Sequence, residues 1–221
     1  MCSAAEIETI CTKAKQCFRR GEKERAIVLF NQAFEIDPNS LNAHQGIATA
    51  YFVSKQYQAA AEHFTRASHI DPRRGNALIN LGAVYNRMGE YQKAIEVLRN
   101  GLRKERNSSE GYYNMGYAQR KLGQPGMAIS AYREAIRLNP KMIDAHQNLA
   151  NIFLSMKNYL QAKTEFRNAL KIDPNFERAK VGLKKCEQAE LKTKKEINPF
   201  GKLVEAQGVQ VEEAPHLGHT L

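Results

Sequence analysis

The sequence predicts an all-α protein in which pairs of short helices stack into a solenoid. Two observations predict this fold: proline preceded by aspartate or asparagine recurs at multiples of 34 residues, and alanine recurs every 34 residues without an insertion. A fixed period of this length is typical of proteins whose repeated units stack on their neighbours. The prolines are Pro38, Pro72, Pro140 and Pro174, and the alanines are Ala26, Ala60, Ala94, Ala128 and Ala162.

The first part of each repeat predicts an amphipathic helix. Counted from the first residue of a repeat, apolar or small residues stand at positions 4, 7, 8 and 11, which share one face of a helix. The third repeat carries this stripe as Leu78, Leu81, Gly82 and Tyr85. A turn follows, and three repeats have a glycine there, which suits a left-handed helix end. These glycines are Gly21, Gly89 and Gly123.

The second part of each repeat predicts another helix. It carries alanine at position 20, an aromatic residue or leucine at position 24 and a small residue at position 27. The helix ends where the following proline bars the preceding residue from helical geometry. Small residues at positions 8 and 20 allow the two backbones to approach closely. A helix pair of this size cannot bury its apolar stripe alone, so we expect neighbouring pairs to stack.

This pattern resembles the tetratricopeptide repeat family, and the resemblance covers about three-quarters of the chain. The third repeat matches the motif of the family best, at Leu78, Leu81, Gly82, Tyr85, Ala94 and Leu98. The chain departs from the motif at position 4, where the family prefers tryptophan and this chain has none. It departs again at Arg106, where the third repeat lacks its proline. The resemblance implies a right-handed superhelix of helix–turn–helix repeats.

The predicted organisation is a solenoid over residues 1–195 followed by a disordered tail over residues 196–221. The five repeats span residues 7–40, 41–74, 75–108, 109–142 and 143–176, and a capping helix spans residues 177–195. That helix carries Lys180, Lys184 and Glu187 where a stacked repeat needs apolar residues, so we expect it to face solvent. At the other end, Ser3 and Glu6 have the spacing of a capping box.

The sequence contains no motif for catalysis, metal binding or cofactor binding, so we expect neither an enzyme nor a cofactor. His44 and His146 occupy position 4, which predicts packing in the core, and His216 and His219 fall in the predicted tail. The four cysteines have no metal or disulfide spacing, which favours reduced thiols in a cytoplasmic protein. Since the chain lacks a long apolar run and the pattern of a signal peptide, we expect no membrane association.

Polar residues mark the surface that remains for function. Positions 2, 6, 9 and 13 lie on the side of the first helix opposite the apolar stripe. Asparagine is frequent at these positions, and an amide can pair with the C=O and N–H groups of an extended peptide. We therefore predict a peptide-binding groove on the concave face, with a solvated polar face as the alternative. The asparagines are Asn42, Asn76, Asn80, Asn114, Asn148 and Asn151.

Aromatic and basic residues accompany these asparagines. Tyr113 and Tyr117 are adjacent on a helix surface, where they would either anchor a ligand or pack against a neighbouring helix. Arg87, Arg120 and Lys121 lie in the third and fourth repeats, where the excess of basic residues is greatest. The net charge of +10 fits a partner with acidic residues or a solvated basic face, and no nucleic-acid-binding pattern is present.

The sequence therefore predicts a non-catalytic scaffold or adaptor that binds a peptide segment or a partner protein in a concave groove. One alternative is an accessory subunit of an enzyme, similar to the repeat array of a transferase without its catalytic half. Another is a structural scaffold that assembles with copies of itself. A carboxylate clamp of the co-chaperone type is disfavoured, because no repeat has the lysine that such clamps carry at position 5.

Overall fold

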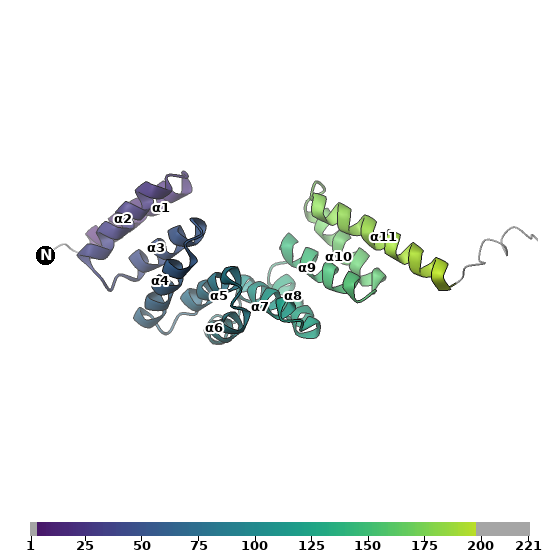
Figure 1. The fold of residues 1–221 in the computed structure, drawn as a ribbon. Coiled ribbons are helices and arrows are strands. Elements are labelled where there is room, and N and C mark those ends of the chain that lie inside the picture. Colours follow the sequence, from purple (N-terminus) through teal and green to yellow (C-terminus); the bar gives the residue numbers. More distant parts are fainter. Residues whose placement is uncertain (1–3, 198–221) are drawn as a thin grey trace, which may run out of the picture.

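The computed structural model describes residues 4–197, and this part of the chain consists of eleven α-helices joined by short turns (Figure 1). The helices are α1 (Ala4–Arg19), α2 (Lys23–Ile36), α3 (Leu41–Val53), α4 (Tyr57–Ile70), α5 (Asn76–Met88), α6 (Tyr91–Lys104), α7 (Ser109–Lys121), α8 (Pro125–Leu138), α9 (Ile143–Ser155), α10 (Tyr159–Ile172) and α11 (Glu177–Ile197). Helix α11 includes residues 196 and 197, which the sequence analysis assigned to the tail. Ser3, His216, His219 and the rest of the predicted tail lie outside the described residues.

The helices form an arch, with α1 and α2 at one end, α5 to α8 in the middle and α11 at the other end (Figure 1). Each helix packs against the next one along the chain, as expected for stacked helix pairs. Odd-numbered helices also contact one another, α1 with α3, α5 with α7, α7 with α9, and α9 with α11. The fold is the all-α solenoid that the sequence predicts.

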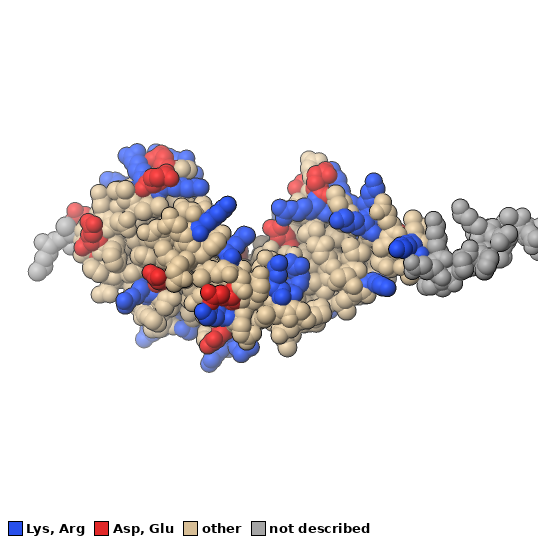
Figure 2. Space-filling model, in the orientation of Figure 1, with Lys and Arg blue, Asp and Glu red and all other residues tan. Residues whose placement is uncertain are grey.

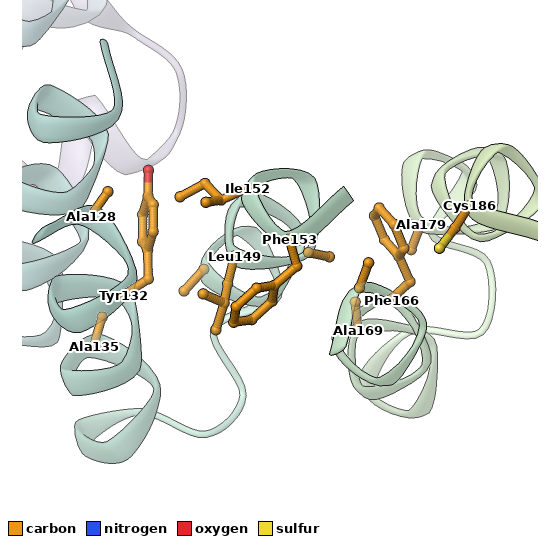
Figure 3. Close-up of a cluster of buried hydrophobic side chains, with 13 residues drawn as sticks. Ala128, Tyr132, Ala135, Leu149, Ile152, Phe153, Phe166, Ala169, Ala179 and Cys186 are labelled. Carbon is orange, nitrogen blue, oxygen red and sulfur yellow. The ribbon is translucent and has the colours of Figure 1, made fainter. Parts of the chain in front are cut away.

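The core consists of the small and bulky residues that recur in the second helix of each repeat. The alanines at position 20, from Ala26 to Ala162, are 0% exposed, and the residues at positions 24 and 27 are also buried. Figure 3 shows how the bulky residues join consecutive repeats, with Tyr132 of α8 beside Ile152 of α9 and Phe166 of α10 beside Cys186 of α11. A Cβ atom on Gly82, at position 8, would overlap the side chain of Leu98. The two helices therefore approach closely at small residues, as predicted.

The missing proline at Arg106 does not change the end of the second helix. Helix α6 ends at Lys104, in register with the repeats that carry proline, and Glu105 leaves the helical conformation with φ −115° and ψ 72°. The backbone N–H of Ser108 donates to the carbonyl of Glu105 at 3.3 Å, which closes the turn. The Ser108 side chain then caps α7 by accepting from the N–H of Gly111 at 3.1 Å. The same turn and serine cap are present at Ser40, after a repeat that has its proline, so the helix end does not depend on proline alone.

The histidines at position 4 are buried, as the sequence predicts, and both are hydrogen-bonded. The Nε2–H of His44 donates to the carbonyl of Pro38 at 3.0 Å, and that of His146 donates to the carbonyl of Pro140 at 3.2 Å. The other ring nitrogen of His146 lies 2.6 Å from the Glu165 carboxylate. Burial opposes the charged form of His146, but its hydrogen bonds to Glu165 and Pro140 outweigh this effect and raise its pKa.

The turn between the two helices of each repeat requires a left-handed residue at position 15. The three predicted glycines have φ between 71° and 84°, which glycine adopts without strain. In the second and fifth repeats the same position is lysine, and Lys55 and Lys157 have φ of 62° and 59°. A residue with a Cβ atom is strained in this conformation, so the left-handed lysine in each of these two turns slightly destabilises the folded protein.

A Lys157→Gly substitution should therefore stabilise the protein, because it relieves the left-handed strain. Glycine also makes the unfolded chain more flexible, which offsets part of this gain, so we expect a net increase of about 0.5 to 1 kcal/mol in the free energy of unfolding. The free energy of unfolding is measured by urea denaturation. The matched control is Gly123→Lys, at a glycine whose Cβ would meet no neighbour, and it should destabilise the protein by a similar amount. Equal stability of the two variants would show that this turn carries no backbone strain.

Candidate binding groove

The inner side of the arch contains an open hollow of about 490 Å³, hereafter the concave groove. All of its lining residues come from odd-numbered helices, chiefly α5, α7 and α9. Figure 2 shows the surface hollowed between the two arms of the arch, with Lys and Arg side chains on either side. Six residues that the sequence predicts for binding line this groove: Arg87, Tyr113, Asn114, Tyr117, Asn148 and Asn151.

The other predicted residues lie elsewhere. Asn80 lines a separate hollow of about 250 Å³ together with Phe30 and Gly46. Asn42 and Asn76 are exposed, and Asn42 accepts a hydrogen bond from Nζ of Lys15 at 3.4 Å. Arg120 and Lys121 lie beside the groove. The cationic group of each is 5.7 Å from the centre of the Tyr117 ring, and Tyr117 lines the groove. Of the predicted asparagines, three thus line the concave groove, one lines the second hollow, and Asn42 and Asn76 line neither.

Two buried phenylalanine rings determine where the asparagines at position 6 end. Position 6 is glycine at Gly46 and at Gly182, and a Cβ atom there would overlap the ring of Phe30 or Phe166, the position-24 residue of the preceding repeat. Both rings are almost completely buried, so they cannot move aside without opening the core. At these two positions the ring leaves no room for a side chain at position 6, although each glycine still lines a hollow of its own.

Within the concave groove, asparagine and tyrosine side chains offer hydrogen-bonding groups. The Nδ2 amide of Asn148 donates to the Tyr113 hydroxyl at 3.2 Å. Burial raises the pKa of Tyr113, so its hydroxyl keeps its proton and can still donate to a ligand. The side-chain amide of Asn114 forms no hydrogen bond with any described residue, although its backbone carbonyl accepts one from Asn86. These groups suit the peptide backbone, which needs both donors and acceptors.

Sequence analysis missed four polar residues of the groove, Asn86, Asp144, Gln147 and Arg178. Oδ1 of Asn86 and Oε1 of Gln147 are buried and accept no hydrogen bond from the described residues. Asp144 and Arg178 form a loose ion pair at 4.0 Å, with both side chains largely exposed. Asn86 stands at position 12 and Gln147 at position 5, on the flanks of the apolar stripe. Sequence analysis selected these two positions only in the fourth repeat, where they carry Arg120 and Tyr113, and did not select the amides that stand there in the third and fifth repeats.

The described residues contain no group of three or more histidine, cysteine or acidic side chains that could hold a metal ion. Cys11, Cys17 and Cys186 are buried free thiols, and burial raises the pKa of Cys11 and of Cys186. Thiols with a raised pKa are poor nucleophiles near neutral pH. None of the helices in residues 4–197 is long and apolar enough to cross a membrane.

Comparison with known protein families shows to which family the chain belongs. Residues 4–187 match the family described as the tetratricopeptide repeat protein 21 C-terminal ARM domain. The chain belongs to this family. The match spans all of the helix pairs and about half of α11, so this ARM domain accounts for nearly the whole described structure. The comparison with curated proteins finds no matching sequence.

Solved structures show the same fold. PilF of Pseudomonas aeruginosa is 19% identical with a TM-score of 0.76, and the similarity covers 93% of this chain and 94% of PilF. YrrB, described as a TPR protein with an unusual peptide-binding site, is 22% identical with a TM-score of 0.63, over 79% of this chain and 90% of YrrB. MamA from Desulfovibrio magneticus RS-1 is 22% identical with a TM-score of 0.67, over 77% and 96%. At these identities the similarity establishes a tetratricopeptide-type solenoid for the ARM domain.

A Gly46→Asn substitution tests the boundary of the asparagine row. The sequence pattern alone would accept asparagine at this position 6, but the structure places the Phe30 ring there. We expect a loss of about 1 to 3 kcal/mol in the free energy of unfolding, because the buried ring must shift. Thr12→Asn, at the exposed position 6 of the first repeat, should change it by less than about 0.5 kcal/mol. A Gly46→Asn protein as stable as the Thr12→Asn protein would contradict this packing.

Proposed function

We propose that this ARM domain is a non-catalytic scaffold that holds an extended peptide segment of a partner protein in the concave groove. The observation that carries the proposal is the position of Asn114 and Asn148. They occupy the same position on adjacent inner helices and both line one open hollow. Because backbone groups recur along every peptide, asparagines in this arrangement bind a peptide with little dependence on its sequence.

The dimensions of the groove suit an extended chain. The axes of packed helices are about 8 to 10 Å apart. An extended peptide advances about 3.3 Å per residue, so Asn114 and Asn148 would meet backbone groups two or three residues apart. Tyr113 and Tyr117 lie between and beside them and offer aromatic surface to the peptide side chains. Together these residues provide backbone recognition and an apolar contact in one site.

Two further points favour a binding protein. The groove lacks a metal-binding group and a reactive thiol among the described residues, whereas its polar lining is rich in amides. YrrB, which shares the fold, is itself described as having a peptide-binding site. No feature of residues 4–197 specifically favours an accessory subunit of an enzyme or self-assembly over a scaffold.

The double variant Asn114→Ala/Asn148→Ala tests this function. Partners are first captured by pull-down on the wild-type protein, and their peptides are then titrated against both proteins. Each substitution should remove hydrogen bonds worth about 0.5 to 1.5 kcal/mol, so the dissociation constant should rise several-fold to more than tenfold. The loss should be similar for different peptide sequences, because backbone contacts do not distinguish side chains.

Asn42→Ala/Asn76→Ala is the matched control, because these exposed asparagines do not line the concave groove. It should bind every partner peptide like the wild type. Thermal unfolding of both double variants checks that the core is intact, since Asn148 also bonds to Tyr113. Binding of unchanged strength by Asn114→Ala/Asn148→Ala would place the binding surface outside the concave groove.

A further inference from the structure

Asn86 contributes a buried acceptor to the concave groove. The residue is 6% exposed, lines the groove, and donates from Nδ2 to the backbone carbonyl of Asn114 at 2.9 Å. This bond fixes the orientation of the amide, because a flipped amide would place two oxygens against each other. Oδ1 therefore remains the unpaired atom and has no partner among residues 4–197. A buried acceptor without a donor is costly, and a ligand N–H would satisfy it.

Basic side chains surround the same end of the groove. Arg87 follows Asn86 in the last turn of α5, and Arg120 and Lys121 end α7. The cationic groups of Arg120 and Lys121 lie 5.7 Å from the centre of the Tyr117 ring, and Tyr117 and Arg87 line the same groove. None of the three forms an ion pair with a described residue. Positive charge is therefore available here.

The opposite end of the groove, at α9 and α11, has less positive charge available for a ligand. There Arg178 lies 4.0 Å from the carboxylate of Asp144, which offsets its charge. An acidic ligand group is thus attracted chiefly to the α5–α7 end. The helix C-termini at that end carry a partial negative charge that disfavours an anion, so binding of a carboxylate must depend on the basic side chains themselves.

We propose that the concave groove selects peptides with an acidic side chain, whose carboxylate binds Arg87 and Lys121 while a neighbouring backbone N–H donates to Oδ1 of Asn86. Arg120 adds positive charge beside Tyr117. This inference rests on the proposed function, and it names the class of peptide and the end of the groove that selects it. The site differs from a co-chaperone clamp, because its cations stand at positions 12 and 13 of the first helix and do not require a free C-terminus.

The probe is a positional library of octapeptides with acetylated N-termini and amidated C-termini, which carry no terminal charge. The library is selected on the wild-type protein and on Arg87→Gln/Lys121→Gln. We expect Asp or Glu to be enriched at one position on the wild type, and this preference to disappear in the double variant. Arg120 is left unchanged, because its Nε atom is buried.

The selected acidic octapeptide should bind the double variant about threefold to tenfold more weakly, whereas its Gln-substituted analogue should bind both proteins equally. The loss should shrink at high salt because the carboxylate contact is screened. The charge-matched control is Arg99→Gln/Arg167→Gln, which removes two exposed arginines of α6 and α10 and should bind like the wild type.

The role of Asn86 as an acceptor is tested by changing the donor groups of the peptide ligand. Replacing one amide of the selected peptide with an ester removes a single N–H donor. On the wild type, one ester position beside the acidic residue should weaken binding about threefold to tenfold. On Asn86→Leu, checked for folding by thermal unfolding, the same ester should have no further effect. Should that variant fail to fold, the ester scan on the wild type still decides, since equal tolerance of all ester positions contradicts the proposed acceptor.

The failure of this inference can be distinguished from that of the proposed function. If octapeptides bind and depend on Asn114 and Asn148 but show no acidic preference, the acidic site is wrong and the peptide groove stands. An acidic preference that persists in Arg87→Gln/Lys121→Gln also overturns the proposed site. If no octapeptide binds, both the groove and its acidic site are contradicted.

Discussion

The close contact between the two helices of each repeat is the constraint on which the rest of the structure depends. Alanine at position 20 is fully buried in every repeat, and position 8 of the first helix is glycine or alanine, where a Cβ atom on Gly82 or Gly116 would press against the position-24 side chain of the same repeat. Because the backbones approach so closely, the bulky residue at position 24 can reach the next repeat and join the two cores, as Tyr132 and Phe166 do (Figure 3). A larger residue would separate the helices and shift each following repeat, and the inner helices would no longer line one groove.

The same packing decides where a ligand can bind. At Gly46 and Gly182 a core phenylalanine occupies the space that a side chain at position 6 would need, so an asparagine cannot stand there without displacing the ring. Between these boundaries Asn114 and Asn148 remain open, and the residues on the flanks of the stripe, such as Asn86, reach the groove from between the helices. The proposed peptide site therefore lies where position 6 carries asparagine and where the flanking polar groups also reach the groove.

Sequence periodicity could predict much of this structure, because a repeat of 34 residues fixes both the helix pair and the positions that must be small. It also selected six residues of the concave groove, five from their place opposite the apolar stripe and Tyr113 as an aromatic neighbour of Tyr117. It could not identify Asn86 or Gln147, since the exposure of a flanking position depends on the helix of the next repeat. Nor could it separate Asn80 from the main groove, because the direction of the Phe30 ring is a tertiary effect. The left-handed conformation of Lys55 and Lys157 could not be predicted either, because lysine has no preference for that conformation.

The most direct test of this account is the free energy of unfolding of Ala128→Leu, measured by urea denaturation. Ala128 is 0% exposed and belongs to α8, in the middle of the arch (Figure 1), so the larger side chain must force α7 and α8 apart. We predict a loss of about 1 to 3 kcal/mol relative to the wild type, whereas Ala5→Leu, at an exposed position of α1, should change the stability by less than about 0.5 kcal/mol. An Ala128→Leu protein as stable as the wild type would contradict the claim that close helix packing at small residues holds the solenoid together.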